Sequence, residues 1–407
     1  MIYYFYAFFK SFLKKAVNFT SVCGIIAEFN PLHKGHKLLI DAAKVGGNRV
    51  VCAISGNFVQ RGDLALISKQ KRAQSALLCG ADLVVEIPVL WSMSTAQNFA
   101  LGGAFSLINA GCDEIIFGSE CGDIDTLKTV ADALLTDEFK GNLENELKLG
   151  ITFAAARQRA LEGMGICADV LQNANDTLGI EYINAAKFLN SDIKFRCIKR
   201  EGSAHDSNVI SGDFVSASLI RQYIKEGKIG FCERFMPLET RGIINEDNTA
   251  DIARIERAIL GILRQKNADD FKVLPDISEG IENKLHFAIR KATSLDELCN
   301  MIKTKRYTMA RIRRLVLSAA LGFDGQFFMK APPYTRVLGF SQSGAELLKR
   351  QNTFVPIITK VSEVSLLESK AKKVFDTESR ASDLWALGLK KPLECGFEFT
   401  AKILKME

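Results

Sequence analysis

Proline, histidine and long apolar runs are scarce in this chain. Its 407 residues include only 8 prolines and 4 histidines. The shortage of proline and the lack of a low-complexity tract argue against a long disordered linker. No run is long and apolar enough to cross a membrane. The aromatic residues 1–9 lack the basic region of a signal peptide, so we expect a cytoplasmic protein.

Residues 1–20 fit neither a signal peptide nor a membrane span. They could form a segment that lies at a membrane interface. They could equally result from a start codon assigned too early, and this is the interpretation that we favour, because a strand pattern begins at residue 22.

The ten cysteines form no C-x-x-C pair, and most have apolar neighbours, as Cys52, Cys79 and Cys167 do. We interpret them as reduced core residues, because a disulfide framework or a zinc site needs paired spacings. The length of the chain is typical of two or three domains.

Charge is distributed unevenly along the chain. Residues 1–250 contain 26 Lys and Arg against 28 Asp and Glu, whereas residues 251–407 contain 27 against 19. The whole basic excess therefore lies in the C-terminal part. This asymmetry favours a polyanionic partner there, although a solvated lysine surface would give the same count.

Short apolar runs alternate with helical patterns along the first 240 residues. Residues 22–27 and 50–55 are typical of buried strands, and residues 34–44 between them of a helix with an apolar stripe at Leu38, Leu39, Ala42 and Ala43. This is a βαβ unit with parallel strands. Further strands are expected at 82–87, 114–117 and 193–198, and helices at 68–79, 96–110, 124–135, 150–162, 180–189 and 216–226. The alternation predicts a doubly wound, Rossmann-like α/β domain.

The strand pattern fades after about residue 237. Helices are expected at 251–266, 279–291, 295–303 and 306–321, with short strands at 353–360 and 397–404. We therefore divide the chain into an extension at 1–20, an α/β domain at 21–240 and a mainly helical, basic domain at 241–407.

Two of the four histidines lie in the sequence His33-Lys34-Gly35-His36, directly after the first strand and an Asn-Pro turn. A helix that starts at the carboxyl end of a strand offers free N–H groups and a positive dipole to a phosphate. Two imidazoles three residues apart lie on one helix face. They could stabilise a phosphoryl transition state by donating hydrogen bonds. They could also be plain helix-start residues, one of them a cap; a metal site is disfavoured because no third ligand follows.

A second cluster contains Ser216, Ser218 and Arg221, at the start of a predicted helix. Its hydroxyls, helix N–H groups and guanidinium could hold the outer phosphates of a nucleotide. Alternatively, Ser216 is an ordinary N-cap. Three charged residues nearby also leave two interpretations open. Arg61 and Asp63 could bind a ligand or form a loop salt bridge, and Glu28 could orient Mg²⁺ or a histidine, or be a simple loop carboxylate.

The two clusters together resemble the nucleotidylyltransferase superfamily, in which H-x-G-H and a late Ser-x-Ser-x-x-Arg element bind ATP. Other segments resemble, in the same order, the bacterial tRNA(Met) cytidine acetate ligase family, from about residue 22 to the C-terminus. They are SGNFVQRGD at 55–63, GADLVVEIP at 80–88, FGSE at 117–120, LGIEY at 178–182 and KRYTMARI at 305–312. GNFVQRG is the most specific, because the wider superfamily lacks it.

The resemblance implies an enzyme that uses ATP and acetate to form acetyl-adenylate and pyrophosphate. The acetyl group then passes to the N4 amine of the wobble cytidine of elongator tRNA(Met). Mg²⁺ is expected to accompany ATP, with no protein-bound metal. His33 and His36 would be catalytic. The implied ATP contacts are Ile26, Ala27, Glu28, Phe29, Asn30, Pro31, Leu32, His33, Lys34, Gly35, His36, Lys37, Leu38, Leu39, Gly102, Asn175, Arg200 and Glu201. The family typically has Pro-Asn-Asn where this chain has Ala174-Asn175-Asp176, and it lacks the extension at 1–20.

A basic segment supplies the expected tRNA contacts. Its six cations within twelve residues have no acid among them and Tyr307 between them: Lys303, Lys305, Arg306, Arg311, Arg313 and Arg314. Cations along a phosphate backbone, with an aromatic ring to stack on a base, are typical of single-strand RNA binding. A solvated basic helix would show the same composition.

Two other functions remain open on the sequence. A small-molecule adenylyltransferase would explain H-x-G-H but would leave the basic region without a role. A nucleotide-sensing RNA-binding protein without turnover would explain both motifs but would release no pyrophosphate.

Overall fold

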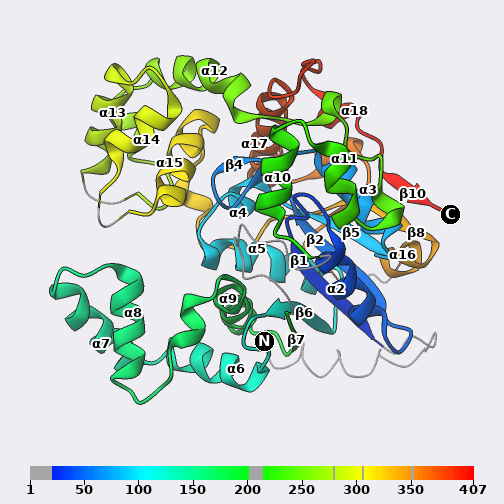
Figure 1. The fold of residues 1–407 in the computed structure, drawn as a ribbon, viewed down its shortest axis with the longest axis horizontal. Coiled ribbons are helices and arrows are strands. Elements are labelled where there is room, and N and C mark those ends of the chain that lie inside the picture. Colours follow the sequence, from blue (N-terminus) through cyan, green and yellow to red (C-terminus); the bar gives the residue numbers. More distant parts are fainter. Residues whose placement is uncertain (1–20, 201–213, 278–279, 305–306, 350–352) are drawn as a thin grey trace.

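The computed structural model describes residues 21–200, 214–277, 280–304, 307–349 and 353–407. Its centre is a mixed sheet with strands in the order β10-β8-β5-β2-β1-β6-β7 and with β9 beside β8 (Figure 1). Five strands run parallel: β1 (Val22–Ala27), β2 (Arg49–Ser55), β5 (Leu83–Ile87), β6 (Glu114–Ser119) and β7 (Lys194–Lys199). Three run in the opposite direction: β8 (Thr335–Ser341), β9 (Ile357–Ile358) and β10 (Leu404–Met406). A separate hairpin pairs β3 (Phe58–Val59) with β4 (Asp63–Leu64).

Helices cover both faces of this sheet, as the sequence predicts for a doubly wound α/β fold. On one face lie α2 (Lys34–Lys44) and α3 (Lys69–Leu78), and on the other lie α5 (Ala96–Asn109) and α9 (Ala174–Phe188). Helix α16 (Gln342–Leu348) packs against β8, β5 and β2, with Leu347 in the core on the α5 side. The alternation of β1 explains the two cores. Cys23 and Ile25 belong to the core on the α2 side, whereas Val22 and Ile26 belong to the core on the α5 side. The predicted fold class is therefore confirmed.

The remaining helices lie around the sheet (Figure 1). They are α4 (Val89–Ser92), α6 (Ile124–Ala133), α7 (Asp137–Lys148), α8 (Phe153–Glu162), α10 (Ala217–Lys225), α11 (Ile229–Cys232), α12 (Ile252–Arg264), α13 (Ile281–Lys291), α14 (Leu295–Ile302), α15 (Met309–Leu321), α17 (Ser369–Ala386) and α18 (Phe397–Thr400). Among these, five have no counterpart among the predicted helices: α4, α7, α11, α17 and α18. In addition, α9 begins at Ala174 rather than at residue 180.

The buried face of α2 differs from the expected stripe. Leu38 is 55% exposed, and the fully buried side chains of the helix are Ile40 and Ala43. Leu39 and Ala42 pack at the edge of the same core. The face of α2 that packs on the sheet is therefore centred on Ile40 and Ala43, and Leu38 points to solvent.

The C-terminal part of the chain is only partly helical. Helices α12 to α15 form a lobe beside the sheet (Figure 1), as expected for residues 251–321. Residues 335–406 then return to the sheet and supply β8, β9 and β10. The strand expected at 397–404 is wrong, because residues 397–400 form α18 and the strand begins at Leu404. Residues on both sides of position 240 thus contribute strands to the same sheet.

No helix among the described residues has the length and apolar character needed to cross a membrane. All ten cysteines are free thiols, but the expectation that they lie in the core holds only for some of them. Cys167, despite its apolar neighbour, is exposed on a turn between α8 and α9, as is Cys395 near the C-terminus.

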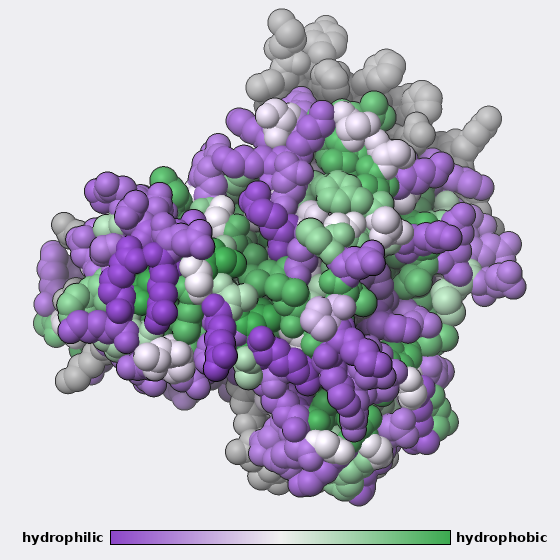
Figure 2. Space-filling model, turned by 90° about the horizontal axis from the view of Figure 1, so that it is seen from above, coloured by the Kyte–Doolittle hydropathy of each residue, from purple (hydrophilic) through white to green (hydrophobic). Residues whose placement is uncertain are grey.

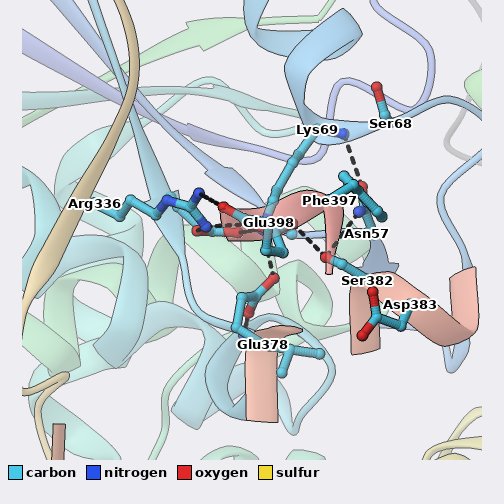
Figure 3. A network of polar contacts seen from close by, with 12 residues as sticks. Asn57, Ser68, Lys69, Arg336, Glu378, Ser382, Asp383, Phe397 and Glu398 are labelled. Carbon is cyan, nitrogen blue, oxygen red and sulfur yellow. Dashed lines mark hydrogen bonds and ion pairs between the residues drawn. The ribbon is translucent and has the colours of Figure 1, made fainter. Parts of the chain in front are cut away.

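A buried ion network joins the returning C-terminal segment to the sheet (Figure 3). Lys69 on α3 is fully buried, and its Nζ lies 2.8 Å from Glu398 Oε1 and 3.0 Å from Glu378 Oε1. It also pairs with Glu86 of β5. Arg336 of β8 pairs with Glu398 and lies 3.6 Å from Glu86 Oε2. Five elements distant in sequence therefore meet at these charges.

Gly56 and Asn57, the first two residues of the segment GNFVQRG, contribute to this network. Asn57 Nδ2 donates to Ser382 Oγ at 3.0 Å, and the backbone N–H of Lys69 donates to Asn57 Oδ1 at 2.8 Å. A Cβ on Gly56 would lie 2.5 Å from Glu378 Oε1, so only glycine lets that carboxylate approach. This part of GNFVQRG thus helps to hold α17, from the C-terminal part of the chain, against α3.

The network contains three carboxyl groups and two cations. With one more acid than base, burial favours the neutral form of one carboxyl group. Burial, followed by repulsion from Glu378, raises the pKa of Glu86 to about 8. Burial also acts against ionisation of Glu398, but Lys69 and Arg336 outweigh it and lower the pKa of that group to about 2. Removing one partner of such a network typically costs about 3–5 kcal/mol, because it leaves a buried charge uncompensated.

Glu86→Gln should flatten the dependence of stability on pH. Above the usual glutamate pKa of about 4.3 the unfolded chain has lost a proton that folded Glu86 keeps. The free energy of unfolding of the wild type should therefore fall as pH rises from about 5 to 8, and the fall should be smaller in the variant. Urea unfolding at a series of pH values measures this, with Glu138→Gln on the exposed side of α7 as the control. Parallel curves for wild type and Glu86→Gln would show that Glu86 is ionised in the fold.

Candidate functional site

In an open α/β sheet, a change in the direction of strand order marks a ligand-binding crevice at the carboxyl ends of the strands. The chain adds β2 and β5 on one side of β1, and then places β6 and β7 on the other side. The segments that leave β1 and β6 therefore diverge, and ligands of open α/β sheets bind at such a switch point. The turn that follows β1 carries the His-x-Gly-His sequence, and the turn that follows β6 carries Glu120.

The turn after β1 has an unusual backbone. Phe29 is buried with a φ of 47°, and the Asn30–Pro31 peptide bond is cis. Asn30 Oδ1 accepts a hydrogen bond from the N–H of Leu66 at 2.7 Å. The hydrogen bond from Leu66 ties this turn to the segment that follows the β3–β4 hairpin, and His33 comes after the turn as the N-cap of α2.

The two histidines form a reciprocal cap on α2. His33 Nδ1 accepts from the N–H of Gly35 at 3.1 Å, and His36 Nδ1 accepts from the N–H of His33 at 3.3 Å. Their rings are stacked, with centroids 3.9 Å apart and 28° between the planes. Because Nδ1 accepts in both rings, the hydrogen of each neutral imidazole belongs on Nε2. Each ring can therefore cap the helix through Nδ1 and donate to a ligand through Nε2. The stacking also confirms the prediction that both rings lie on one face of the helix.

The serine and arginine cluster lies against the same turn. Ser216 is the N-cap of α10, accepting from the N–H of Leu219 at 3.3 Å, and its Oγ lies 3.0 Å from Ser218 Oγ. Arg221 Nη1 donates to the carbonyl of Asn30 at 2.7 Å. Residues almost 200 positions apart therefore meet at one wall of the crevice.

The opposite wall centres on Glu120, which the sequence analysis gave no role. Asn175 Nδ2 donates to Glu120 Oε1, and Arg200 Nε lies 3.9 Å from the same oxygen. Glu120 Oε2 accepts from the N–H of Asp176 at 3.2 Å. Fully buried Asp176 in turn accepts from the N–H groups of Glu120 and Cys121. The predicted contacts Asn175 and Arg200 are thus brought together by a carboxylate at the end of β6.

Other predicted contacts have different environments. Gly102 lies in α5, and a Cβ there would come within 2.5 Å of the Cβ of buried Trp91, so close packing already requires glycine. Lys37 pairs with Asp41, and Leu38 faces solvent. Glu201 lies outside the described residues.

Arg72 is a second residue that sequence reasoning missed. It is fully buried on α3, and burial lowers the pKa of its guanidinium to about 10. Its Nη1 donates to the carbonyl of Glu28 at 2.7 Å and to Ser55 Oγ at 3.1 Å. Glu28 Oε1 accepts from the N–H of Gln60 at 2.9 Å. These contacts fix the start of the histidine turn against the end of β2 and the β3–β4 hairpin.

The predicted basic segment is divided between interior and surface. Arg311 Nη2 lies 3.0 Å from Asp276 Oδ1, and its guanidinium lies 4.5 Å from the centroid of Tyr307. Arg314 Nη1 donates to the carbonyl of Gln60 at 3.1 Å, and burial lowers its pKa. These two arginines therefore have contacts within the protein.

Lys303 and Arg313 are the exposed members of the segment. The side chain of Arg313 is 47% exposed, with its Nη2 3.9 Å from Asp296 Oδ1. Lys305 and Arg306 lie outside the described residues. Figure 2 shows that hydrophilic side chains cover most of the lobe at the left of that view, which contains α12 to α15. Within the described part of the segment, two of the four cations are therefore exposed, and Asp276 and Asp296 lie close to its arginines.

Comparisons with known proteins agree with this arrangement. The model of a family described as HIGH Nucleotidyl Transferase matches residues 20–396. The chain is 37% identical over 400 residues to the tRNA(Met) cytidine acetate ligase of Thermoanaerobacter sp. strain X514, a match that covers 95% of this chain and 100% of that protein. It is 38% identical over 402 residues to the protein of the same name from Caldanaerobacter subterraneus subsp. tengcongensis, covering 94% and 99%.

Two crystal structures of Thermotoga maritima TmcAL share the fold. The apo form superposes with a TM-score of 0.89 at 30% identity, and the form bound with alpha-thio ATP with a TM-score of 0.87 at 29% identity. Both comparisons cover 95% of this chain and all of the other.

Proposed function

This chain belongs to the tRNA(Met) cytidine acetate ligase family of HIGH nucleotidyl transferases, and we propose that its switch-point crevice joins acetate to the α-phosphate of ATP. The enzyme is a ligase. Acetate attacks the α-phosphorus, pyrophosphate leaves, and the acetyl group of the resulting acetyl-adenylate is transferred to N4 of the wobble cytidine of elongator tRNA(Met). The stacked and capped pair His33 and His36 is the observation that carries this proposal.

The histidine pair suits stabilisation of a pentavalent phosphorus. The capping bonds set the orientation of both rings before the ligand arrives, so little reorganisation is needed in the transition state. The N-terminus of α2 adds its dipole. We assign Ser216, Ser218 and Arg221 to the outer phosphates, because Arg221 is held at the histidine turn.

We assign Asn175 and Arg200 to the nucleotide from the β6 side of the crevice. Their shared carboxylate, Glu120, would hold both side chains in position. Gly102 would act only through its backbone. Mg²⁺ would be bound chiefly by the phosphates themselves. The described residues include no group of three His, Cys, Asp or Glu side chains arranged to hold a metal ion.

We propose that tRNA contacts the exposed cations of the helical lobe. Lys303 and Arg313 are the described members of the basic segment whose side chains reach the surface. Contacts to the phosphate backbone would make binding strongly salt-dependent.

The overall reaction is tested by incubating the protein with ATP, isotopically labelled acetate and tRNA, followed by mass spectrometry of the nucleosides. We expect labelled N4-acetylcytidine, and pyrophosphate release that requires acetate. Release with a metabolite and without RNA would instead indicate a small-molecule adenylyltransferase, and ATP binding without any release would indicate a sensor.

His33→Asn should separate capping from catalysis. Asparagine is a good N-cap, so we expect the stability of the fold to be nearly retained, whereas His33→Ala should lose about 1 kcal/mol. Both variants, and His36→Ala, should slow acetate-dependent pyrophosphate exchange far more than they weaken ATP binding, because the rings act mainly on the transition state. Exchange kinetics and ATP titrations measure the two effects. Wild-type exchange in His33→Asn would remove His33 from the mechanism.

Arg313→Glu and Lys303→Glu should weaken tRNA binding and reduce its salt dependence, because each removes a surface cation. Pyrophosphate exchange without tRNA should be unchanged. Arg311→Glu serves as the contrasting variant, because loss of its Asp276 pair should lower the melting temperature. Unaltered tRNA affinity in the double variant Lys303→Glu/Arg313→Glu would place the RNA surface elsewhere.

A further inference from the structure

A cleft of about 350 Å³ lies next to the phosphate cluster, between the β3–β4 hairpin, α10 and the start of α12. Its walls include the apolar side chains of Leu64, Leu66 and Ile252. Its polar lining includes Asp63 and Arg221. None of the roles assigned above explains this cleft.

The cleft lies between the nucleotide site and the helical lobe. It shares Ser218 and Arg221 with the phosphate cluster, and Arg221 reaches the carbonyl of Asn30 in the histidine turn. On the other side, the loop of the β3–β4 hairpin is held to α15 by the bond from Arg314 to Gln60. Because the cleft shares two residues with the phosphate cluster, a group bound in it would lie next to the nucleotide site.

Asp63 is the carboxylate that the β3–β4 hairpin contributes to the cleft, whose lining also includes Glu226 and Asp251. Its Oδ1 accepts from the N–H of Leu64 at 2.8 Å. Burial raises the pKa of Asp63, although Lys225, Arg221 and Arg313 act to lower it. Lys225 itself lies 3.3 Å from Asp251 Oδ1, so its charge is shared with a second acid.

This combination matches a pyrimidine nucleotide with an exocyclic amine. Asp and Glu accept hydrogen bonds from the N4 amine of cytosine, apolar side chains cover the ring, and arginine and lysine hold the phosphates. A base in single-stranded RNA can leave its stack and enter such a pocket.

We propose that this cleft receives the target cytidine and that Asp63 accepts a hydrogen bond from its N4 amine. The inference rests on the proposed function. In the transfer step N4 forms a bond to the acetyl carbonyl carbon, and the bond from that carbon to the AMP oxygen breaks with its electron pair. The proton lost from N4 passes to the Asp63 carboxylate and then to water.

Asp63→Asn tests this assignment in the full-length enzyme. Acetate-dependent pyrophosphate exchange should stay within about twofold of wild type, because the first half-reaction does not use the Asp63 carboxylate. Single-turnover transfer from preformed acetyl-adenylate to tRNA should slow by about 100-fold. Asp63→Glu should recover part of the rate, and Asp137→Asn on the exposed α7 is the control that should behave as wild type.

The pH profile distinguishes a base from a structural carboxylate. The transfer rate of the wild type should fall at low pH as Asp63 becomes protonated, and this limb should be missing in Asp63→Asn. The charged groups that face Asp63 are Arg221, Lys225 and Glu226 from α10, Asp251 before α12, and Arg313 from α15. Substituting these groups should shift the pH at which the transfer rate falls, but the fall at low pH should remain.

Gln222→Trp provides a second test that leaves Asp63 intact. Gln222 is exposed and lines the cleft, so tryptophan there should fill the space without disturbing the core. We expect transfer to be lost and exchange to be retained. Wild-type transfer in Asp63→Asn or in Gln222→Trp would overturn the assignment, as would an equal loss of exchange and transfer. Absence of exchange in the wild type would instead contradict the proposed function itself.

Discussion

The fold depends on a single buried ammonium group. Lys69 has no exposed surface, and the carboxylates that pair with it in the described structure belong to β5, α17 and α18. A charge in such a place is highly unfavourable unless all its partners are present. The C-terminal segment must therefore pack against the carboxyl edge of β2 and β5. That edge is continuous with the one that carries the histidine turn, so the same constraint supports the site.

Local patterns were sufficient to predict the elements that build the histidine turn. β1 and α2 have the predicted bounds, because a buried run, an Asn-Pro break and a Gly-Gly stop all act over a few residues. β8 was missed because its burial arises from pairing with β5, far away in the sequence, and because Arg336 within it resembles a surface residue. The charge at Glu86 inside an apolar strand was the available signal that a buried partner exists.

The site shows the same division between local and distant information. The histidine pair and the N-cap at Ser216 follow from short motifs. Glu120 and Arg72 could not be assigned, because Glu120 meets Asn175 and Asp176, and Arg72 meets Glu28, only in the fold. The basic segment shows the same limit, because its composition does not indicate that Asp276 and the backbone of Gln60 hold two of its arginines.

The distance in sequence between Lys69 and Glu378, 309 positions, affects how this protein is made. A nascent chain that emerges from the ribosome presents the first βαβ units long before the counter-ions of Lys69 exist. The lysine must stay hydrated until α17 and α18 are available, so the N-terminal half is not expected to reach its final packing during synthesis. Full folding should therefore follow release of the C-terminus, and a truncated product would expose the sheet edge that β8 normally covers.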